Sequence, residues 1–190
     1  MRKNLFPGEI ILSSSSPRRR KILSMFFKVY VVKPSVDEKF YKDPIQMVME
    51  NSERKVLYVK DRRGIVVSGD TVVVFKRKIL GKPKNEEDAV RMLSLLSNNW
   101  HEVYSGFSFI YSGKIYRDFS VSRVKFRKMD KDEIVNYVKS GEPMDKAGGY
   151  AIQGKGSIFV ERISGCYFAI VGFPVVKFIK RLKEVVIENS

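Results

Sequence analysis

The sequence has few of the residues from which redox and zinc sites are usually built. A single cysteine, Cys166, excludes an intrachain disulfide and favours a reducing compartment. A single histidine, His101, excludes a zinc site of the Cys–His finger type. The apolar alternation around His101 favours a structural role over membership of a catalytic triad. We therefore expect neither a disulfide scaffold nor a zinc domain.

Long apolar runs are also missing. No stretch approaches the ~20 consecutive apolar residues that cross a bilayer. The start, Met1 to Pro7, has positive charges but no long apolar core behind them, so it does not fit a secretory signal. These absences predict a cytoplasmic protein with no membrane segment.

The residues that are present suit one globular domain. The 190 residues are 44% hydrophobic, 12% aromatic and 30% charged, which suits a packed core beneath a solvated surface. We expect a single domain over residues 1–190. The net charge of +15 comes from Lys and Arg scattered along the chain. That charge fits a solvated surface, a site for a polyanionic small molecule, or nucleic-acid binding, and it decides little among them.

Short apolar stretches alternate with amphipathic ones along the chain. Asp43, Asn85 and Asp130 each stand before a helical pattern, where an Asn or Asp side chain can cap the free N–H groups. Helices are expected at 17–27, 44–60, 86–96, 131–139 and 173–186. Strands are expected at 9–13, 29–33, 65–68 and 71–75, in a hairpin over 101–126 that turns at 112–114, and in a pair at 157–163 and 167–171. The pattern predicts an α/β fold with a mixed, largely antiparallel sheet flanked by helices.

Near the N-terminus, a buried strand leads into a serine loop and then a basic helix. Residues 10–20 are Ile-Ile-Leu-Ser-Ser-Ser-Ser-Pro-Arg-Arg-Arg, with Ser16 as the expected N-cap and Pro17 as the first helical residue. Open N–H groups at a helix start, hydroxyls before it and Arg side chains suit a phosphate-bearing ligand. An ordinary capped helix with a basic solvent-facing side explains the same residues, and the glycine-rich Walker pattern is absent.

An acid lies in the middle of an apolar stretch. Residues 66–74 are Val-Val-Ser-Gly-Asp-Thr-Val-Val-Val, and a buried Asp70 is costly without a partner or a metal ion. Gly69 permits a bulge or the close approach of a ligand. Asp70 could hold a divalent cation or accept a proton from water. The alternative is a turn acid between two strands of a hairpin.

Two further segments combine loop-forming residues with charge. Lys82 and Lys84 stand before the helix start at Asn85, on a loop stiffened by Pro83, and are either phosphate partners or ordinary surface lysines. Residues 141–156 hold several glycines, which allow backbone to approach a ligand closely. Gln153 in that segment can both donate and accept hydrogen bonds at a base edge. A flexible surface crossover is the alternative for this second segment.

A pair of carboxylates follows the second expected strand. Asp37 and Glu38 come shortly after Pro34. Such a pair is usually an exposed turn. Opposite a triphosphate it could instead supply the second half of a metal site.

Together and in this order, these motifs resemble the Maf family of nucleotide pyrophosphatases. The sequence departs from the family in Ser13, where Ala is usual, and in Gly149. The resemblance covers almost the whole chain. The matching segments are Leu12-Ser13-Ser14-Ser15-Ser16-Pro17-Arg18-Arg19, Ser68-Gly69-Asp70-Thr71-Val72-Val73, Leu80-Gly81-Lys82-Pro83-Lys84, residues 141–150 continuing to Gln153-Gly154, Ser105-Gly106, and Gly172-Phe173-Pro174.

The resemblance implies an elongated fold with two lobes around a central cleft, similar to the inosine triphosphate pyrophosphatases. It implies hydrolysis of dTTP or UTP, with CTP and modified pyrimidine nucleotides as further candidates, to the monophosphate and pyrophosphate. Mg²⁺ or Mn²⁺ and a homodimer are expected by the same analogy. The dTTP- and UTP-preferring subfamily carries Arg after the Pro, as Arg18 does here. A sister subfamily acting on 7-methyl-GTP has a tryptophan in that region, which is missing here.

The resemblance also implies roles for single residues. Asp70 matches the catalytic proton acceptor and Asp37 an acid near the metal, so both are expected metal ligands. The positions matching Arg18, Thr71 and Gln153 are linked to base preference. The remaining expected phosphate-site residues are Ser14, Ser16, Arg19, Lys55 and Lys82.

Two other interpretations stay open. A purine pyrophosphatase acting on ITP or XTP shares the chemistry but requires purine readout. A non-catalytic protein that binds nucleic acid or a cell-division partner would show strongly salt-dependent binding and no metal-dependent release of pyrophosphate. The motifs make nucleic acid the less favoured partner and a nucleoside triphosphate the favoured one.

Overall fold

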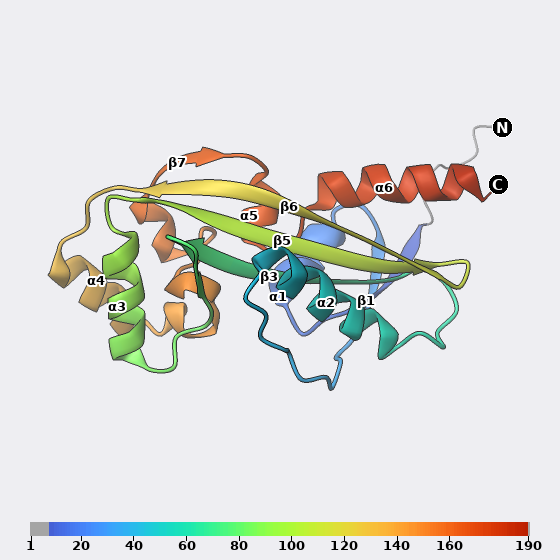
Figure 1. Cartoon of the computed structure of the whole chain (residues 1–190), viewed down its shortest axis with the longest axis horizontal. Coiled ribbons are helices and arrows are strands. Elements are labelled where there is room, and N and C mark those ends of the chain that lie inside the picture. The colour runs from blue at the N-terminus through green and yellow to red at the C-terminus, as the bar shows by residue number, and fades with distance from the viewer. Residues whose placement is uncertain (1–7, 190) are drawn as a thin grey trace. The chain divides into compact units, whose positions relative to one another are not determined.

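The structure is a computed structural model and describes residues 8–189 (Figure 1). The start, Met1 to Pro7, lies outside the described residues, and so does the prediction about a secretory signal. Over residues 8–189, no helix has both the length and the apolar character needed to cross a membrane. The chain divides into two compact units. Unit 1 is Met1–Asp70, Ser105–Ser120 and Gly172–Ser190, and unit 2 is Thr71–Tyr104 and Val121–Val171.

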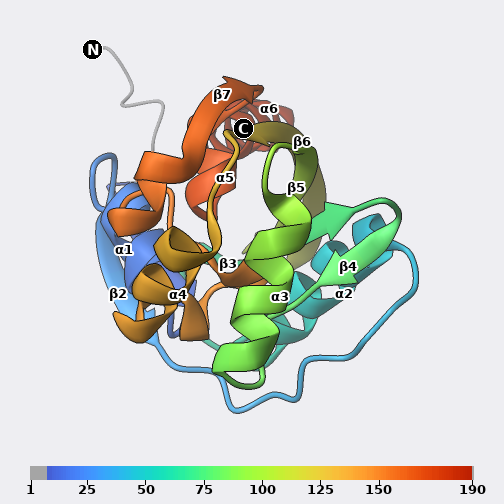
Figure 2. The same cartoon turned by 90° about the vertical axis from the view of Figure 1, so that its left-hand side faces the viewer.

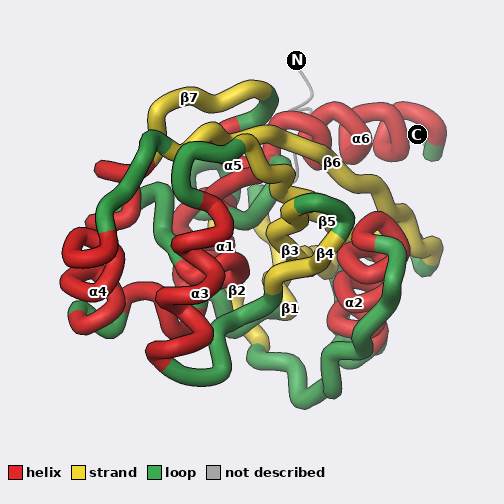
Figure 3. Tube along the Cα trace, turned by 60° about the vertical axis from the view of Figure 1, so that its left-hand side comes forward, coloured by secondary structure: helices red, strands yellow, loops and turns green. Residues whose placement is uncertain are grey.

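Within residues 8–189, seven strands form one mixed sheet in the order β2-β1-β3-β5-β6-β7, with β4 paired to β3. In unit 1, β1 pairs in parallel with β2 and with β3. Figure 3 draws the strands in yellow and the helices in red. In unit 2, β4 runs antiparallel to β3, and β7 antiparallel to β6. This confirms the mixed α/β sheet flanked by helices. The strands are β1 (Glu9–Ser13), β2 (Lys28–Val32), β3 (Val66–Phe75), β4 (Lys78–Leu80), β5 (Trp100–Tyr111), β6 (Lys114–Phe126) and β7 (Val160–Ser164).

The helices of unit 1 are α1 (Pro17–Leu23), α2 (Pro44–Leu57) and α6 (Val175–Glu188). The predicted caps of α1 and α2 form: the Ser16 side chain accepts from the Arg19 N–H, and Asp43 accepts from two N–H groups of α2. Helix α1 ends at Leu23, earlier than predicted. Helix α6 buries Phe178, whose ring packs edge-on against Phe107 and Phe109 of β5 at 5.6 Å in each case.

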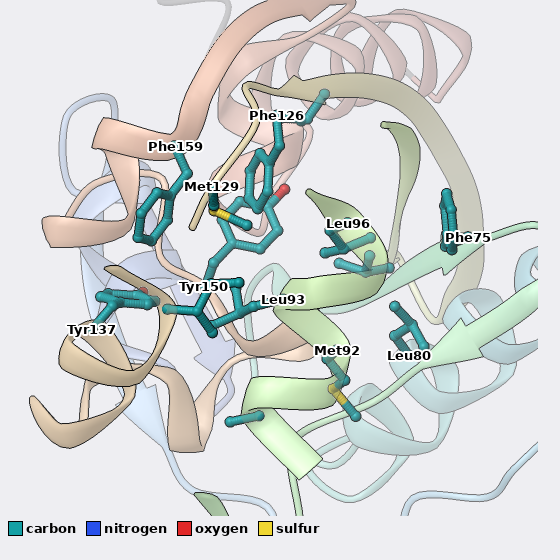
Figure 4. Close-up of a cluster of buried hydrophobic side chains, with 14 of the residues drawn as sticks. Phe75, Leu80, Met92, Leu93, Leu96, Phe126, Met129, Tyr137, Tyr150 and Phe159 are labelled. Carbon is teal, nitrogen blue, oxygen red and sulfur yellow. The ribbon is translucent and has the colours of Figure 1, made fainter. Parts of the chain in front are cut away.

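Unit 2 holds α3 (Glu86–Leu96) and α4 (Lys131–Lys139), which lie against each other (Figure 2). Asn85 caps α3, and Asp130 with Glu133 forms a capping box on α4, so both cap predictions are confirmed. Buried side chains from these helices and from the strands form the core of the unit (Figure 4). The rings of Phe126, Tyr150 and Phe159 lie within this core.

The predicted strand pair at 157–163 and 167–171 is wrong. Only Val160–Ser164 is a strand, and the residues before it, Lys155–Phe159, form a 3₁₀ turn. Tyr167–Val171 is a short helix, α5. Gly165, with φ +109°, turns the chain out of the sheet, and the hydroxyl of Ser122 binds both the N–H and the carbonyl of Cys166. A short apolar run has no periodicity that separates strand from buried helix, so tertiary contacts decided here.

The stretch around Asp70 is one strand, not two. β3 runs without a break from Val66 to Phe75, so the turn between two hairpin strands is excluded as an explanation of Asp70. The actual hairpin turn lies at Lys76 and Arg77, whose φ values of 46° and 64° suit a tight two-residue turn. The strand after it, β4, was not predicted.

Candidate functional site

Three charged side chains of unit 1 meet at one point. Lys55 of α2 donates from Nζ to Asp70 Oδ1 at 2.9 Å and to Glu38 Oε1 at 2.6 Å. The side chains of Lys55 and Asp70 are 7% and 9% exposed, whereas that of Glu38 is 50% exposed. One ammonium group therefore holds two carboxylates together, one buried in the sheet and one reaching solvent.

The pKa of Asp70 is set by opposing effects. Burial raises the pKa of the carboxyl, and the charges of Lys55 and Arg19 lower it, with a net rise above the ordinary value. Glu38 raises it further because a second negative charge disfavours ionisation. Burial lowers the pKa of Arg19, while Asp70 and Glu38 raise it. The Asp70 carboxylate therefore accepts a proton more readily than an exposed aspartate does, and the positive charges of Lys55 and Arg19 partly offset the effect of burial.

The serine loop after β1 holds Arg19 in place. The hydroxyl of Ser14 accepts from Arg19 Nη1 at 3.3 Å and from the backbone N–H of Ser16 at 3.2 Å. Arg19 Nε donates to the carbonyl of Gly172 at 2.9 Å. Arg18, directly before it, is partly buried. The serine loop and the Gly172 carbonyl thus hold the Arg19 guanidinium at two of its nitrogens, and Arg18 lies beside it on the first turn of α1.

Gly69 permits the close packing of Arg19 on β3. A Cβ atom at position 69 would lie 3.1 Å from the carbonyl oxygen of Gly106 and 3.3 Å from Arg19 Nε. Either contact is tighter than an ordinary van der Waals distance. Gly69 therefore makes room for the Arg19 guanidinium next to the buried Asp70.

The buried face of α2 is unusually polar. Val48, Asn51, Ser52 and Lys55 follow helical spacing and are all buried. The hydroxyl of Ser52 lies 2.8 Å from that of Ser108 on β5, and Ser68 of β3 donates to the Ser52 carbonyl at 2.7 Å. These bonds fix α2, and with it Lys55, to the neighbouring strands β3 and β5.

The predicted residues of unit 2 lie on β3 and on two loops. Thr71 follows Asp70 on β3, and Lys82 and Gln153 are exposed loop residues. The N–H of Gly148 donates to the Gly81 carbonyl at 3.0 Å, which ties the segment after β4 to the glycine-rich segment. The roles of Lys82 and Gln153 toward a nucleotide stay predictions.

The glycine-rich segment is organised around one carboxylate. Glu142 accepts from the Tyr137 hydroxyl at 2.8 Å and from the N–H groups of Lys155 and Gly156 at 3.0 Å each. The Tyr137 hydroxyl in turn accepts from the Ala151 N–H at 3.1 Å. The segment that carries Gln153 is therefore a series of short, bonded turns rather than a flexible crossover.

His101 belongs to the core of unit 2. Its Nε2 lies 2.8 Å from the Tyr150 hydroxyl, and its ring packs edge-on against Phe126 at 4.9 Å. Among the described residues, its Nδ1 has no hydrogen-bond partner. A catalytic histidine usually has a third group that orients its ring, and His101 lacks such a group at Nδ1. The structural interpretation of this histidine fits these contacts.

The structure brings together Ser14, Ser16, Arg19, Lys55 and Asp70 of the predicted set. The carboxylate that shares Lys55 with Asp70 is Glu38, whereas the predicted ligand Asp37 is its exposed neighbour. The resemblance singled out Asp37 from this pair, and the sequence pattern of an irregular loop does not show which of two adjacent acids faces inward. The polar residues on the buried stripe of α2 indicate that this face of the helix meets polar groups, but they do not single out Glu38 as the partner of Lys55.

The chain is similar to known proteins over most of its length. A family model described as Maf-like protein matches residues 9–185. The chain is 47% identical over 180 residues to the dTTP/UTP pyrophosphatase of Thermococcus kodakarensis, covering 92% of this chain and 95% of that one. It is 47% identical over 184 residues to the protein of the same name from Clostridium tetani, covering 92% and 96%. The protein of that name from Aquifex aeolicus is 41% identical over 179 residues, covering 92% and 94%.

A solved structure, the Ham1 protein of Staphylococcus aureus, is 15% identical, with a TM-score of 0.47 over 80% of this chain and 79% of that one. A similarity at that level does not establish a common fold.

Proposed function

The chain belongs to the Maf-like protein family, and from this membership and the charged cluster at Asp70 we propose that it hydrolyses dTTP and UTP to the monophosphate and pyrophosphate. The names of its 41–47% identical relatives support the substrates. The observation that carries the proposal is the convergence of Asp70 and Glu38 on Lys55, beside the firmly held Arg19. Such a cluster offers a base, positive charge and two metal-binding carboxylates at one point.

In this mechanism Asp70 is the proton acceptor. A water oxygen attacks the α-phosphorus, and the water proton passes to a carboxylate oxygen of Asp70. The bond from the α-phosphorus to the bridging oxygen breaks, and pyrophosphate leaves with the electron pair. The position of Asp70 suits this role, because its buried carboxylate lies among the cationic groups that would bind the triphosphate.

Cationic side chains would bind the triphosphate and offset its charge. Arg19, held through Ser14 and Gly172, presents a fixed guanidinium. A guanidinium binds two phosphate oxygens at once, and preorganised charge contributes strongly to such reactions. Lys55 would shift from the carboxylates toward the substrate. We propose Ser16, Arg18 and Lys82 as further phosphate contacts, and Thr71 and Gln153 as contacts to the base.

The donor set fits a divalent cation. The carboxylates of Asp70 and Glu38 share the single positive charge of Lys55. Over residues 8–189, no group of three or more His, Cys, Asp or Glu side chains could hold a metal ion, so the substrate would have to supply further ligands. Mg²⁺ characteristically binds one or two carboxylates together with substrate phosphates. When bound, Mg²⁺ or Mn²⁺ supplies charge that stabilises the triphosphate oxygens. Asp70 and Glu38 would hold it, with Asp37 as a third proposed ligand that an Asp37→Asn variant tests.

Three further expectations are part of the proposal. The two units would belong to one Maf-like domain, which the family match over residues 9–185 supports. The single Cys166 suits a reducing cytoplasm, and family analogy suggests a homodimer. Sedimentation at several protein concentrations would decide the last point, because a monomer at all concentrations would contradict it.

The test is product analysis on a panel of dTTP, UTP, CTP, GTP, ITP and 7-methyl-GTP, with and without Mg²⁺. Metal-dependent release of pyrophosphate and monophosphate, fastest from dTTP or UTP, is the expected result. Preference for ITP would point to the purine pyrophosphatases. If a folded sample hydrolysed none of these nucleotides and bound DNA in a salt-dependent way, the result would favour the non-catalytic binding protein.

A further inference from the structure

The loop that carries Glu38 has no regular structure of its own. Residues 33–43 connect β2 to α2 and contain neither helix nor strand (Figure 1). Glu38 itself is half exposed. A carboxylate on such a loop needs another contact to stay beside Lys55, because an irregular exposed segment samples many conformations.

Asn51 of α2 supplies that contact. Its Nδ2 donates to the Lys39 carbonyl at 2.9 Å, and its Oδ1 accepts from the Lys39 N–H at 2.9 Å. Asn51 is 1% exposed, so its amide is shielded from solvent, whereas Lys39 on the loop is exposed. A primary amide carries a donor and an acceptor side by side, as this pair of bonds requires. The side chain therefore satisfies both backbone polar groups of Lys39, as a neighbouring strand would.

The position of Asn51 relative to Lys55 completes the geometry. The two residues are four apart on α2, so they lie on one face of the helix, one turn apart. Asn51 binds the backbone of residue 39, and Lys55 binds the side chain of residue 38. Adjacent loop residues are thus held by adjacent turns of a helix that Ser52 fixes to the sheet.

We propose that Asn51 is a positioning residue that sets the Glu38 carboxylate beside Asp70 and so determines how tightly the site takes up a divalent cation. The inference rests on the proposed function, in which Glu38 and Asp70 hold that cation. Asn51 touches neither substrate nor metal and acts through the loop. Partners that orient a metal ligand typically change metal affinity about 10- to 100-fold when removed.

The test compares Asn51→Leu, which keeps the approximate volume but loses both bonds, with Asn51→Ala, which keeps high helix propensity if Leu packs badly. Asn136→Leu, at an exposed position of α4, is the matched control. Hydrogen exchange of the Lys39 amide is the first readout and needs no activity. Loss of the acceptor should speed this exchange about tenfold in both Asn51 variants, and leave it unchanged in the control.

The second readout is the Mg²⁺ concentration for half-maximal turnover, together with Mn²⁺ affinity measured by electron paramagnetic resonance. We expect both to weaken about 10- to 100-fold, with kcat at saturating metal within about threefold of wild type. Faster exchange at Lys39 with unchanged Mn²⁺ affinity would overturn the positioning role. If the wild type turns over no nucleotide, the proposed function fails, and exchange with Mn²⁺ affinity still decides the role of Asn51.

Discussion

Asp70 in unit 1 and His101 in unit 2 are both buried and titratable, yet their surroundings differ in kind. Asp70 contacts Lys55 at 2.9 Å and feels the charges of Arg19 and Glu38. His101 contacts a phenol hydroxyl at 2.8 Å and lies edge-on to two aromatic rings, those of Phe126 and Tyr150. The first residue lies among charges, and the second among neutral aromatic groups.

Burial moves both groups toward their neutral forms, and only Asp70 has charges that oppose it. Burial lowers the pKa of His101 from 6.5 to about 3. Burial also raises the pKa of Asp70, but Lys55 and Arg19 lower it again. His101 therefore stays neutral and packs, while Asp70 can exchange a proton. Burial of a titratable group does not by itself mark a reactive site, and the charged neighbours make the difference.

The largest effect is expected from Asp70→Asn. Removing a general base typically slows turnover about 10²–10⁴-fold, while the amide keeps the shape of the carboxyl. The measurement is pyrophosphate release from dTTP at saturating Mg²⁺, with Asp61→Asn, which changes an exposed acid, as the control. If the Asp70→Asn variant kept the wild-type rate, Asp70 would have no role in proton transfer.

The second prediction concerns acid stability, and it arises from His101. The unfolded histidine takes up a proton near pH 6.5, and the folded one only near pH 3. The stability that neutral His101 contributes is therefore complete above pH 6.5 and falls as the pH drops through this window. At pH 5 the loss should be about 2 kcal/mol. In His101→Phe, denaturation midpoints between pH 7 and pH 5 should change less than in wild type.

An equal loss in the wild type and in His101→Phe would show that other groups cause the acid sensitivity. The turnover of His101→Phe at pH 7, per folded molecule, should stay near the wild-type value. A loss as large as that of Asp70→Asn would remove the distinction between the two buried groups.

The third prediction concerns the structural role of Glu142, a carboxylate of unit 2. Burial raises the pKa of Glu142, but backbone bonds from Gly156 and Lys155 lower it below the ordinary value, so these bonds favour the charged form. Glu142→Gln replaces an acceptor of N–H bonds by a weaker, neutral one, and should cost about 1–2 kcal/mol of unfolding free energy. Urea denaturation measures this. An unchanged midpoint would mean that the glycine-rich segment is held by other contacts.

The smallest effect is expected on the exposed face of α2. Arg117 pairs with Glu50 at 3.2 Å and with Glu53 at 2.7 Å, and its side chain is 43% exposed. Exposed pairs contribute about 0.2–1 kcal/mol, and salt screens them. Arg117→Gln should therefore shift the unfolding free energy by about that amount, less at high salt, with turnover unchanged. A large loss of turnover would place functional charge on both faces of this helix.

Local chemistry made much of the fold predictable. The caps at Ser16, Asp43, Asn85 and Asp130 form as predicted, because capping depends on residues a few positions apart. Asp70 stood out because an acid within an apolar strand needs compensation. The strand proposed at 167–171 failed, since a short apolar run fits a strand and a buried helix equally well.

Contacts between residues far apart in the chain could not be predicted from the sequence. The choice of Glu38 over Asp37 as the partner of Lys55 depends on a contact 17 residues apart, and on the bonds of Asn51 to the Lys39 backbone. Helical spacing shows that Asn51 and Lys55 share a face, but not what that face meets. The path of the loop over residues 33–43 determines which residues meet this face of α2, and no local sequence pattern predicts that path.

The most direct test of the charged cluster at Asp70 is a crystal structure with Mn²⁺ and a dTTP analogue whose α–β bridging oxygen is replaced by methylene. We predict anomalous manganese signal between the carboxylates of Asp70 and Glu38, with the triphosphate oxygens on the metal and on Arg19. Manganese and triphosphate bound elsewhere, with Lys55 still joining Asp70 to Glu38, would contradict the proposed site.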